Sequence, residues 1–409
     1  MRMPRKCPHA TGSDIVLPGT ASKEAIVGRR LVGMLGDQLQ ALHARPVHGN
    51  RRLLTDHIVV AHLVAFFNPT VASLRTIEDV FEHDEVRRRM NLPRVPRSTL
   101  ADAQRGFDLN LLQPLVDDLV RRIGRLPYDA RLDAVSRKIT AVDASVFEVA
   151  SLIAWALPHN TTSARGAIQW CLHFDVLHGA PDGFTVIGGQ ESERTQLPQA
   201  ILPHRLYLLD RAYQSYAHLG RIVEIGSDFV VRLRSTANFV ELEQRTLSLD
   251  DRRAGVLRDQ VVTPADRHHR FAVPVRLVEI AATEGDEPVR LLTNRLDLPA
   301  DMIGLLYRHR WQIELFFRWI KCVTHLRHFF SESSTGMALQ LYVAMIGTLL
   351  IALETGARPS KYDFAQMSLV AAGMVSLENA KAVMARRRAE RARAAKWQAQ
   401  YRAAKKAAH

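Results

Sequence analysis

Apolar residues three and four positions apart recur along the first third of the chain, which is the spacing of a helix with one buried face. Turn-forming residues and prolines divide this pattern into four segments, at residues 22–43, 54–67, 73–90 and 109–126. A further short helix is expected at Ser98, a favourable N-cap. The pattern therefore predicts an α-helical N-terminal domain, which we bound at residues 1–130.

From about residue 136 the pattern changes to short apolar strands. Strands are expected at residues 137–149, 167–179, 183–189, 205–210 and 229–234, with a helix at 212–226. Three strands followed by a strand–helix–strand unit predict a mixed α/β sheet with helices packed on it. We assign this core to residues 131–235 and 297–380. Residues 236–296, rich in Val, Leu and charge, are predicted to form an inserted β-rich subdomain.

The most apolar run of the chain extends from Leu339 to Leu353. It is shorter than the roughly 20 residues that a membrane-spanning helix needs. We therefore expect a buried core helix and no membrane partner.

Positive charge is concentrated at the end of the chain. The formal net charge is +13, and residues 381–409 hold ten Lys or Arg against one acidic residue, a net +9. This basic C-terminal tail is predicted to be a helix without an apolar face, and such charge favours a polyanionic partner. A second basic group in the helical domain either meets DNA backbone or is a solvated surface: Arg87, Arg88, Arg89, Arg94, Arg97 and Arg105.

Cysteine usage indicates a reducing compartment. The three cysteines, Cys7, Cys171 and Cys322, are scattered and odd in number, so they do not form a disulfide framework. The basic start of the chain is not followed by the apolar segment of a secretory signal. We expect the protein to stay in the cytoplasm.

Two aspartates occur in apolar strands. Asp143 lies inside TAVDAS and Asp210 ends LYLLD. A carboxylate in such a place is costly unless a cation satisfies it, and a metal ion would do so. Each also has a structural alternative, because Asp210 could cap the following helix and Asp143 could bond to the backbone.

A polar stripe marks one later helix. Its four members fall within about 60° of one helix face: Tyr307, Arg310, Glu314 and Lys321. An exposed Arg310–Glu314 pair is the alternative interpretation. Four aromatic residues are expected to bury the other sides of the helix: Trp311, Phe316, Phe317 and Trp319. A polar stripe on such a helix favours a functional site.

The Y-x2-R-x3-E-x6-K spacing of this stripe resembles the signature of the bacterial insertion-sequence-4 family of DDE transposases. VDAS around Asp143 and LLDRAY around Asp210 are similar to that family, and the resemblance covers about residues 136–350. It implies a ribonuclease-H-like catalytic core in which Asp143, Asp210 and Glu314 are catalytic and hold metal. Carboxylate oxygens suit Mg²⁺ or Mn²⁺, and phosphoryl displacement favours two ions.

The same resemblance implies DNA contacts by five residues: Tyr307, Arg310, Lys321, Arg211 and Trp311. It implies strand cleavage at transposon ends and strand transfer into target DNA. The partners would be terminal inverted repeats, target DNA and a second copy of the chain in the synaptic complex. Two alternatives stay open: a nuclease of the same fold without strand transfer, and a non-enzymatic DNA-binding protein derived from a transposase.

Overall fold

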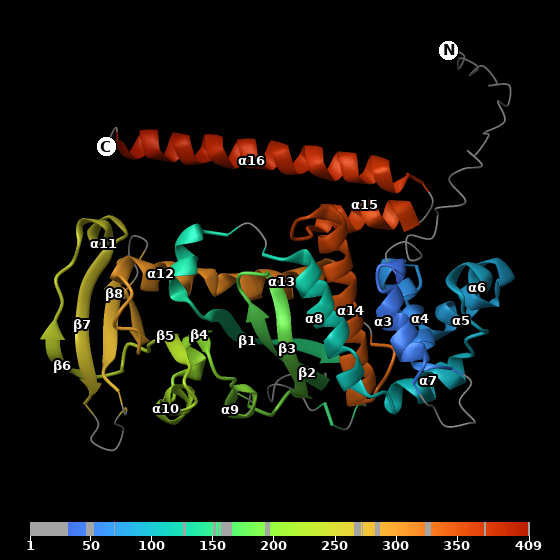
Figure 1. Ribbon diagram of the computed structural model, residues 1–409, viewed down its shortest axis with the longest axis horizontal. Helices are drawn as coiled ribbons and strands as arrows, with labels where there is room; N and C mark the ends of the chain where they lie inside the picture. The colour runs from blue at the N-terminus through green and yellow to red at the C-terminus, as the bar shows by residue number, and fades with distance from the viewer. Residues whose placement is uncertain are drawn as a thin grey trace, which may run out of the picture.

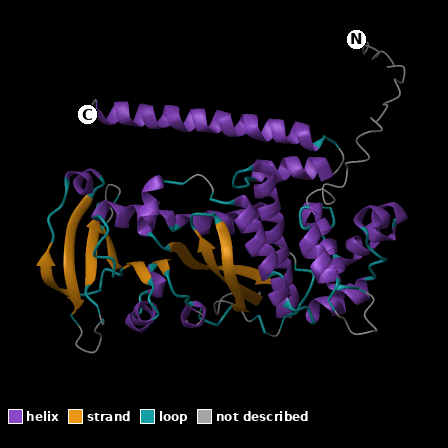
Figure 2. Ribbon diagram, viewed as in Figure 1, coloured by secondary structure: helices purple, strands orange, loops and turns teal. Residues whose placement is uncertain are grey.

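One nine-stranded mixed sheet runs through the molecule in the order β3-β2-β1-β4-β5-β9-β8-β7-β6 (Figure 1; Figure 2). The computed structural model describes residues 32–45, 53–68, 70–125, 128–149, 153, 155–156, 166–192, 197–265, 271, 273–282, 287–323, 329–371 and 374–407. The strands are β1 Lys138–Val149, β2 Gly166–Asp175, β3 Ala180–Gly188, β4 Arg205–Leu209, β5 Asp228–Arg232, β6 Phe239–Gln244, β7 Val256–Pro264, β8 Val275–Ile280 and β9 Val289–Thr293. The five strands expected from the alternating pattern of the core are confirmed.

The register of β1 fixes which face of the sheet its aspartate occupies. β1 pairs antiparallel with β2 and parallel with β4, and β4 pairs parallel with β5. Because side chains alternate along a strand, Asp143 shares its face with Ala141. By the same alternation Asp210 continues the face of Leu208, and Ala141 and Leu208 belong to one core cluster. Both aspartates therefore belong to the same face of the sheet.

Helices cover the two faces of the sheet (Figure 1). On one face lie α9 Leu197–Ala200 and α10 Tyr216–Glu224, and the apolar residues Leu219 and Ile222 of α10 pack into the smaller core cluster. On the face of the aspartates lie α12 Ala300–His309 and α13 Trp311–Val323, and α13 contacts β1 directly. The sheet thus presents its two aspartates to α12 and α13.

Strands β6–β9 extend the sheet beyond β5. β9 pairs antiparallel with β5, so the strands of residues 236–296 continue the same sheet. Arg276 of β8 and Asp259 of β7 form a buried pair, with Arg276 Nε donating to Asp259 Oδ1 at 2.7 Å. Arg276 Nη1 also donates to Leu298 O at 2.5 Å, just before α12 begins. The added strands therefore help to hold the start of α12.

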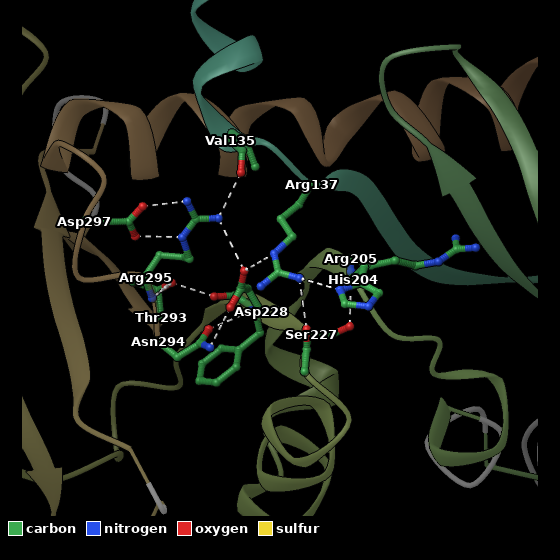
Figure 3. A network of polar contacts seen from close by, with 12 residues as sticks. Val135, Arg137, His204, Arg205, Ser227, Asp228, Thr293, Asn294, Arg295 and Asp297 are labelled. Carbon is green, nitrogen blue, oxygen red and sulfur yellow. Dashed lines mark hydrogen bonds and ion pairs between the residues drawn. The ribbon is translucent and has the colours of Figure 1, made fainter.

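A polar network ties together the strand ends remote from Asp210 (Figure 3). Asp228, the first residue of β5, accepts from Arg137 Nε at 3.2 Å and from Arg295 Nη1 at 3.3 Å. Asn294 Nδ2 donates to Asp228 Oδ1 at 2.9 Å, and Arg295 also donates to Val135 O at 3.1 Å. One carboxylate thus joins the start of β1, the start of β5 and the end of β9.

The apolar run forms a core helix. α14 spans Ser334–Thr355 and is long and apolar enough to cross a membrane, but 94% of its most apolar 18-residue window is buried inside the protein. Seventeen consecutive residues, Gly336–Ala352, are buried. The expectation of a buried core helix is confirmed.

The N-terminal segments fold mainly as helices: α3 Gly36–His43, α4 Thr55–Phe67, α5 Leu74–Glu82, α6 Asp84–Met90, α7 Arg97–Arg105 and α8 Gln113–Ile123. The third expected helix is two, because His83 adopts an extended backbone with ψ 117° and separates α5 from α6. α7 begins at Arg97 after Pro96, so the expected Ser98 cap is wrong. Residues 22–31 of the first expected helix lie outside the described residues.

Two buried histidines make folding depend on pH. His62 of α4 is 2% exposed and His173 of β2 is 8% exposed. Burial lowers the pKa of each to about 4, because the protein interior solvates an imidazolium poorly. His62 Nδ1 lies 2.8 Å from Ile58 O, to which it donates. Both side chains are therefore neutral in the folded protein at pH 7.

We expect the free energy of unfolding to fall as the pH is lowered from 7.5 to 5. The unfolded chain protonates these histidines near pH 6.5 and so binds more protons than the folded state until about pH 4. Each histidine should cost about 2 kcal/mol over this range, measured by urea unfolding. His62→Leu should remove its share of the dependence of the unfolding free energy on pH; a dependence equal to that of the wild type would contradict the assignment.

Candidate active site

The polar stripe lies across a junction between two helices. α12 ends at His309, α13 begins at Trp311, and Arg310 forms the turn between them. Arg310 N donates to Tyr307 O at 3.1 Å, and Ile313 N donates to Arg310 O at 3.2 Å. These bonds span three residues instead of four and tighten the turn. The expected single helix is therefore wrong, although Tyr307, Arg310 and Glu314 still face the sheet.

Arg310 joins the first and third acidic residues. Its Nη1 lies 3.3 Å from Asp143 Oδ2, and its Nη2 lies 2.5 Å from Glu314 Oε1. The Arg310 side chain is 9% exposed, whereas Asp143 is 21% and Glu314 28% exposed. The alternative of an exposed Arg310–Glu314 pair is thus wrong, because the guanidinium is buried against β1.

Asp210 approaches the same group through Tyr307. The Tyr307 hydroxyl lies 3.5 Å from Asp210 Oδ1. The structural alternative for Asp210 is present in part: its Oδ1 accepts from Arg211 N at 2.6 Å and caps the short turn η4 Arg211–Tyr213. The expected helix itself begins later, as α10, and is capped by Ser215. Asp143 Oδ1 likewise accepts from Ala144 N at 2.9 Å. Each aspartate thus has one oxygen held by the backbone, which fixes the orientation of its carboxylate.

The charges of the site act on Arg310 and Tyr307. Burial opposes ionisation of Arg310, but Tyr307, Glu314 and the two aspartates outweigh it and raise the pKa of Arg310. Burial is the main cause that raises the pKa of the Tyr307 hydroxyl. Arg310 therefore stays a cation and Tyr307 a neutral donor over the physiological range.

The remaining candidate contacts surround this group less closely. Lys321 of α13 lies over the Phe147 ring of β1, with Nζ 5.0 Å from the ring centroid. Arg211 is exposed beside Asp210. Trp311 is 49% exposed, so the expectation that it buries a side of the helix is wrong. Its position as the first residue of α13, next to the turn at Arg310, leaves it at the surface. The other three aromatic residues are buried as expected: Phe316, Phe317 and Trp319.

One basic residue near the site was not singled out from the sequence. Arg232 ends β5, and its neighbour Val231 pairs with Leu209, the residue before Asp210. Its charge acts on the Tyr307 hydroxyl. The sequence offers one indication of Arg232: it is a charged residue at the end of the apolar segment FVV, just as Asp210 is at the end of LYLL.

The donor set is that of a hard metal ion. Asp143, Asp210 and Glu314 offer six carboxylate oxygens and no thiolate, which suits Mg²⁺ or Mn²⁺. Among the described residues, these carboxylates do not form a group whose ligand atoms all lie within 4.8 Å of one another. Arg310 stands between Asp143 and Glu314 and supplies the positive charge there. The carboxylates therefore suit a metal ion in their chemistry, while in this structure Arg310 occupies the position between Asp143 and Glu314.

Residues 135–350 match the sequence model of the transposase DDE domain. The chain belongs to the transposase DDE domain family. This match covers more than half of the 409 residues and contains all three acidic residues of the site.

Relatives of this transposase-domain chain carry transposase names. "Putative transposase y4zB" of Sinorhizobium fredii is 33% identical over 147 residues, 36% of this chain and 41% of the relative, so the alignment spans less than half of that protein. "Probable transposase for insertion sequence element IS5377" of Geobacillus stearothermophilus is 22% identical over 263 residues, 64% of this chain and 67% of the relative. A solved piggyBac transposase synaptic complex with hairpin DNA aligns with 90% of this chain and 74% of that chain at 10% identity and a TM-score of 0.34. A TM-score this low does not establish a shared fold.

Proposed function

We propose that this transposase-domain chain cuts DNA at the ends of a mobile element and joins the ends to target DNA. The observation that carries the proposal is the contact of one guanidinium, Arg310, with both Asp143 and Glu314, while Tyr307 reaches Asp210. Three acidic residues that are far apart in the sequence thus lie around the guanidinium of Arg310 and the phenol of Tyr307. Such a mixture of carboxylates and phosphate-binding groups suits phosphoryl transfer.

Asp143, Asp210 and Glu314 would hold Mg²⁺ or Mn²⁺, and we propose two ions. When bound, the metal lowers the pKa of water and neutralises charge on the reacting phosphate. The backbone holds Asp143 Oδ1 and Asp210 Oδ1, and the second oxygen of Asp143 contacts Arg310. We therefore propose that these two aspartates are oriented before any ligand arrives.

Arg310 is suited to grip a phosphate beside the carboxylates. Its Nη1 and Nη2 contact Asp143 and Glu314 at the site, and its Nε is buried without a hydrogen-bond partner among the described residues. The fork of donors matches phosphate oxygens, whereas Lys321 would act as a point charge. Tyr307, Arg211 and the exposed Trp311 complete the proposed DNA contacts, and Arg232 joins them.

The strand order supports a ribonuclease-H-like core. β1, β2 and β3 form an antiparallel meander, and β4 and β5 are added parallel to β1 on its other side. The first Asp lies on β1, the second follows β4, and the Glu lies on a helix after β5, as the resemblance implies. The Y-x2-R-x3-E-x6-K spacing supports placement in the insertion-sequence-4 family.

DNA is the proposed partner, as terminal inverted repeats and as target, and two copies of the chain would hold two ends together. The helical domain is the proposed DNA-binding domain. Several arginines there are engaged within the protein; for example, Arg94 Nε donates to Glu82 Oε1 at 2.7 Å. We further propose a cytoplasmic location near the nucleoid.

Metal removal tests the reaction. With the flanking inverted repeat as a labelled duplex, Mg²⁺ should permit nicking that releases a 3′-OH, and EDTA should abolish it. Pre-cut ends should then join a target plasmid, because the same carboxylates serve both steps. Nicking without joining would contradict the proposal and indicate a nuclease. Binding without nicking in Mg²⁺ or Mn²⁺ would indicate a non-enzymatic DNA-binding protein.

A further inference from the structure

The chain ends in a long exposed helix. α16 spans Leu377–Ala407, 31 residues, which at 1.5 Å per residue is about 46 Å. In Figure 1 it runs above α12 and α13, from α15 Lys361–Ala371 toward the end of the molecule that holds α11 Leu249–Arg253. Between residues 389 and 401 every described side chain is exposed. The described side chains of this part of α16 are therefore not packed on the protein.

The first half of α16 is docked on α14 and α15 by one side. Lys381 Nζ lies 2.8 Å from Glu354 Oε1. Arg388 Nη2 lies 3.2 Å from Asp363 Oδ2. Three apolar residues on this side are buried: Leu377, Ala380 and Met384.

Tyr362 of α15 strengthens this attachment. The guanidinium carbon of Arg391 lies 4.3 Å from the centroid of the Tyr362 ring, and that of Arg387 lies 5.5 Å from it. Such cation–π contacts are worth about 0.5–1 kcal/mol each at exposed sites. The docked side thus already uses four basic residues of the helix, Lys381, Arg387, Arg388 and Arg391, for contacts within the protein.

The opposite side of α16 faces solvent and carries a basic and aromatic surface. At about 100° per residue, an arc of about 140° centred opposite the docked side holds the acids Glu378 and Glu390, with Arg386 Nε 4.0 Å from Glu390 Oε1. The same arc holds three basic and two aromatic residues: Arg386, Arg393, Lys396, Trp397 and Tyr401. The Trp397 and Tyr401 rings stack 5.6 Å apart at 16° and are 65% and 60% exposed. We call these five residues the outer face of α16.

Charge decides which partner suits the outer face. α16 as a whole holds ten basic and two acidic residues, a net charge of +8, although both acids lie on the side of the outer face. Its exposed half has no continuous apolar stripe. Two such helices would repel each other and would lack the apolar seam of a coiled coil. A DNA duplex offers a dense row of negative charge, and Arg, Lys, Tyr and Trp all donate to phosphate oxygens.

We propose that the outer face of α16 is a second DNA-contacting surface, apart from the carboxylate site, which grips the phosphate backbone of duplex DNA without reading its bases. The inference rests on the proposed function only in its choice of DNA as the polyanion. In the proposed complex, the docked half of α16 holds the helix on the protein, and the exposed half lies along the DNA.

The test compares two triple variants of equal net charge. One removes the outer basic residues: Arg386→Gln, Arg393→Gln and Lys396→Gln. The matched control removes three exposed arginines elsewhere: Arg221→Gln, Arg253→Gln and Arg258→Gln, whose side chains are 57%, 78% and 56% exposed. The affinity of each full-length protein for a duplex of about 30 base pairs without element ends is measured from 50 to 200 mM salt.

We expect the outer-face variant to bind at least about tenfold more weakly at 100 mM salt. Its slope of log affinity against log salt should shrink by about two to three, because each phosphate that the variant no longer neutralises reduces the slope by about 0.9. The control should keep the slope of the wild type, and unchanged circular dichroism should show that the helix persists.

An unchanged slope in the outer-face variant, or an equal change in the control, overturns the inference. A changed oligomeric state with unchanged DNA affinity assigns the outer face to a protein partner instead and also overturns it. Mg²⁺-dependent nicking of saturated end duplex is scored separately. Absence of nicking by the wild type, with the slope difference intact, defeats only the proposed function.

Discussion

Glu314→Gln should abolish Mg²⁺-dependent nicking of end DNA while end binding persists. The change keeps the size of the side chain but removes one of three negative charges that would hold metal. We expect the nicking rate to fall by about a thousandfold or more, equal to about 4 kcal/mol of transition-state stabilisation. Arg310 would keep its contact with Asp143 at 3.3 Å, so the fold around the site should survive.

The measurement is single-turnover nicking of a labelled end duplex, with affinity followed by gel shift. Glu224→Gln is the matched control, because Glu224 is 64% exposed on α10, on the other face of the sheet, and pairs with the exposed Arg221 at 3.4 Å. It should nick at the rate of the wild type. Retained Mg²⁺-dependent cutting by Glu314→Gln would show that Glu314 is not one of the metal-holding residues.

Asp259→Ala should destabilise the protein by about 3–5 kcal/mol, because it leaves the Arg276 guanidinium buried without its carboxylate. The two side chains, Arg276 and Asp259, are 2% and 4% exposed, and Arg276 Nη2 lies 2.6 Å from Asp259 Oδ2. Since Arg276 also holds Leu298 O before α12, hydrogen exchange should rise at the start of that helix. Urea unfolding measures the decrease in stability.

Two companion variants separate burial from mere removal of a charge. Asp250→Ala breaks the Arg253–Asp250 pair, in which both side chains are 78% exposed, and should change stability by less than about 1 kcal/mol. Asp259→Leu combined with Arg276→Met replaces the buried pair by apolar groups and should recover most of the stability. A cost for Asp259→Ala no larger than that for Asp250→Ala would show that the buried pair is not needed.

Local pattern was sufficient for the five strands of the core and for the buried helix α14. Short apolar segments placed β1 around Asp143 and β4 before Asp210, and the apolar run from Leu339 to Leu353 indicated a buried helix. These features are local, because the order of apolar and polar side chains within a strand or helix decides which of its faces is buried. The spacing of the polar residues from Tyr307 to Lys321 was likewise recognised from the sequence alone.

Contacts between distant segments were decided only by the tertiary structure. The turn at Arg310 divides the expected helix, because bonds spanning three residues tighten the backbone there. The exposure of Trp311 and the position of Arg232 depend on which elements happen to lie nearby. The continuation of the sheet from β5 into β9 also joins residues about 60 positions apart, which periodicity does not encode.

The sequence by itself therefore determined the mixed α/β character of the chain and the acidic and basic residues on which a transposase assignment rests. The tertiary structure decided that one guanidinium contacts Asp143 and Glu314 and that Tyr307 reaches Asp210. It also decided that α16 is docked by one side and exposed on the other. The physical reason is that the spacing of residues along a helix or strand decides which face of that element a side chain occupies. The residue that it contacts across the gap depends on how separate elements pack against each other.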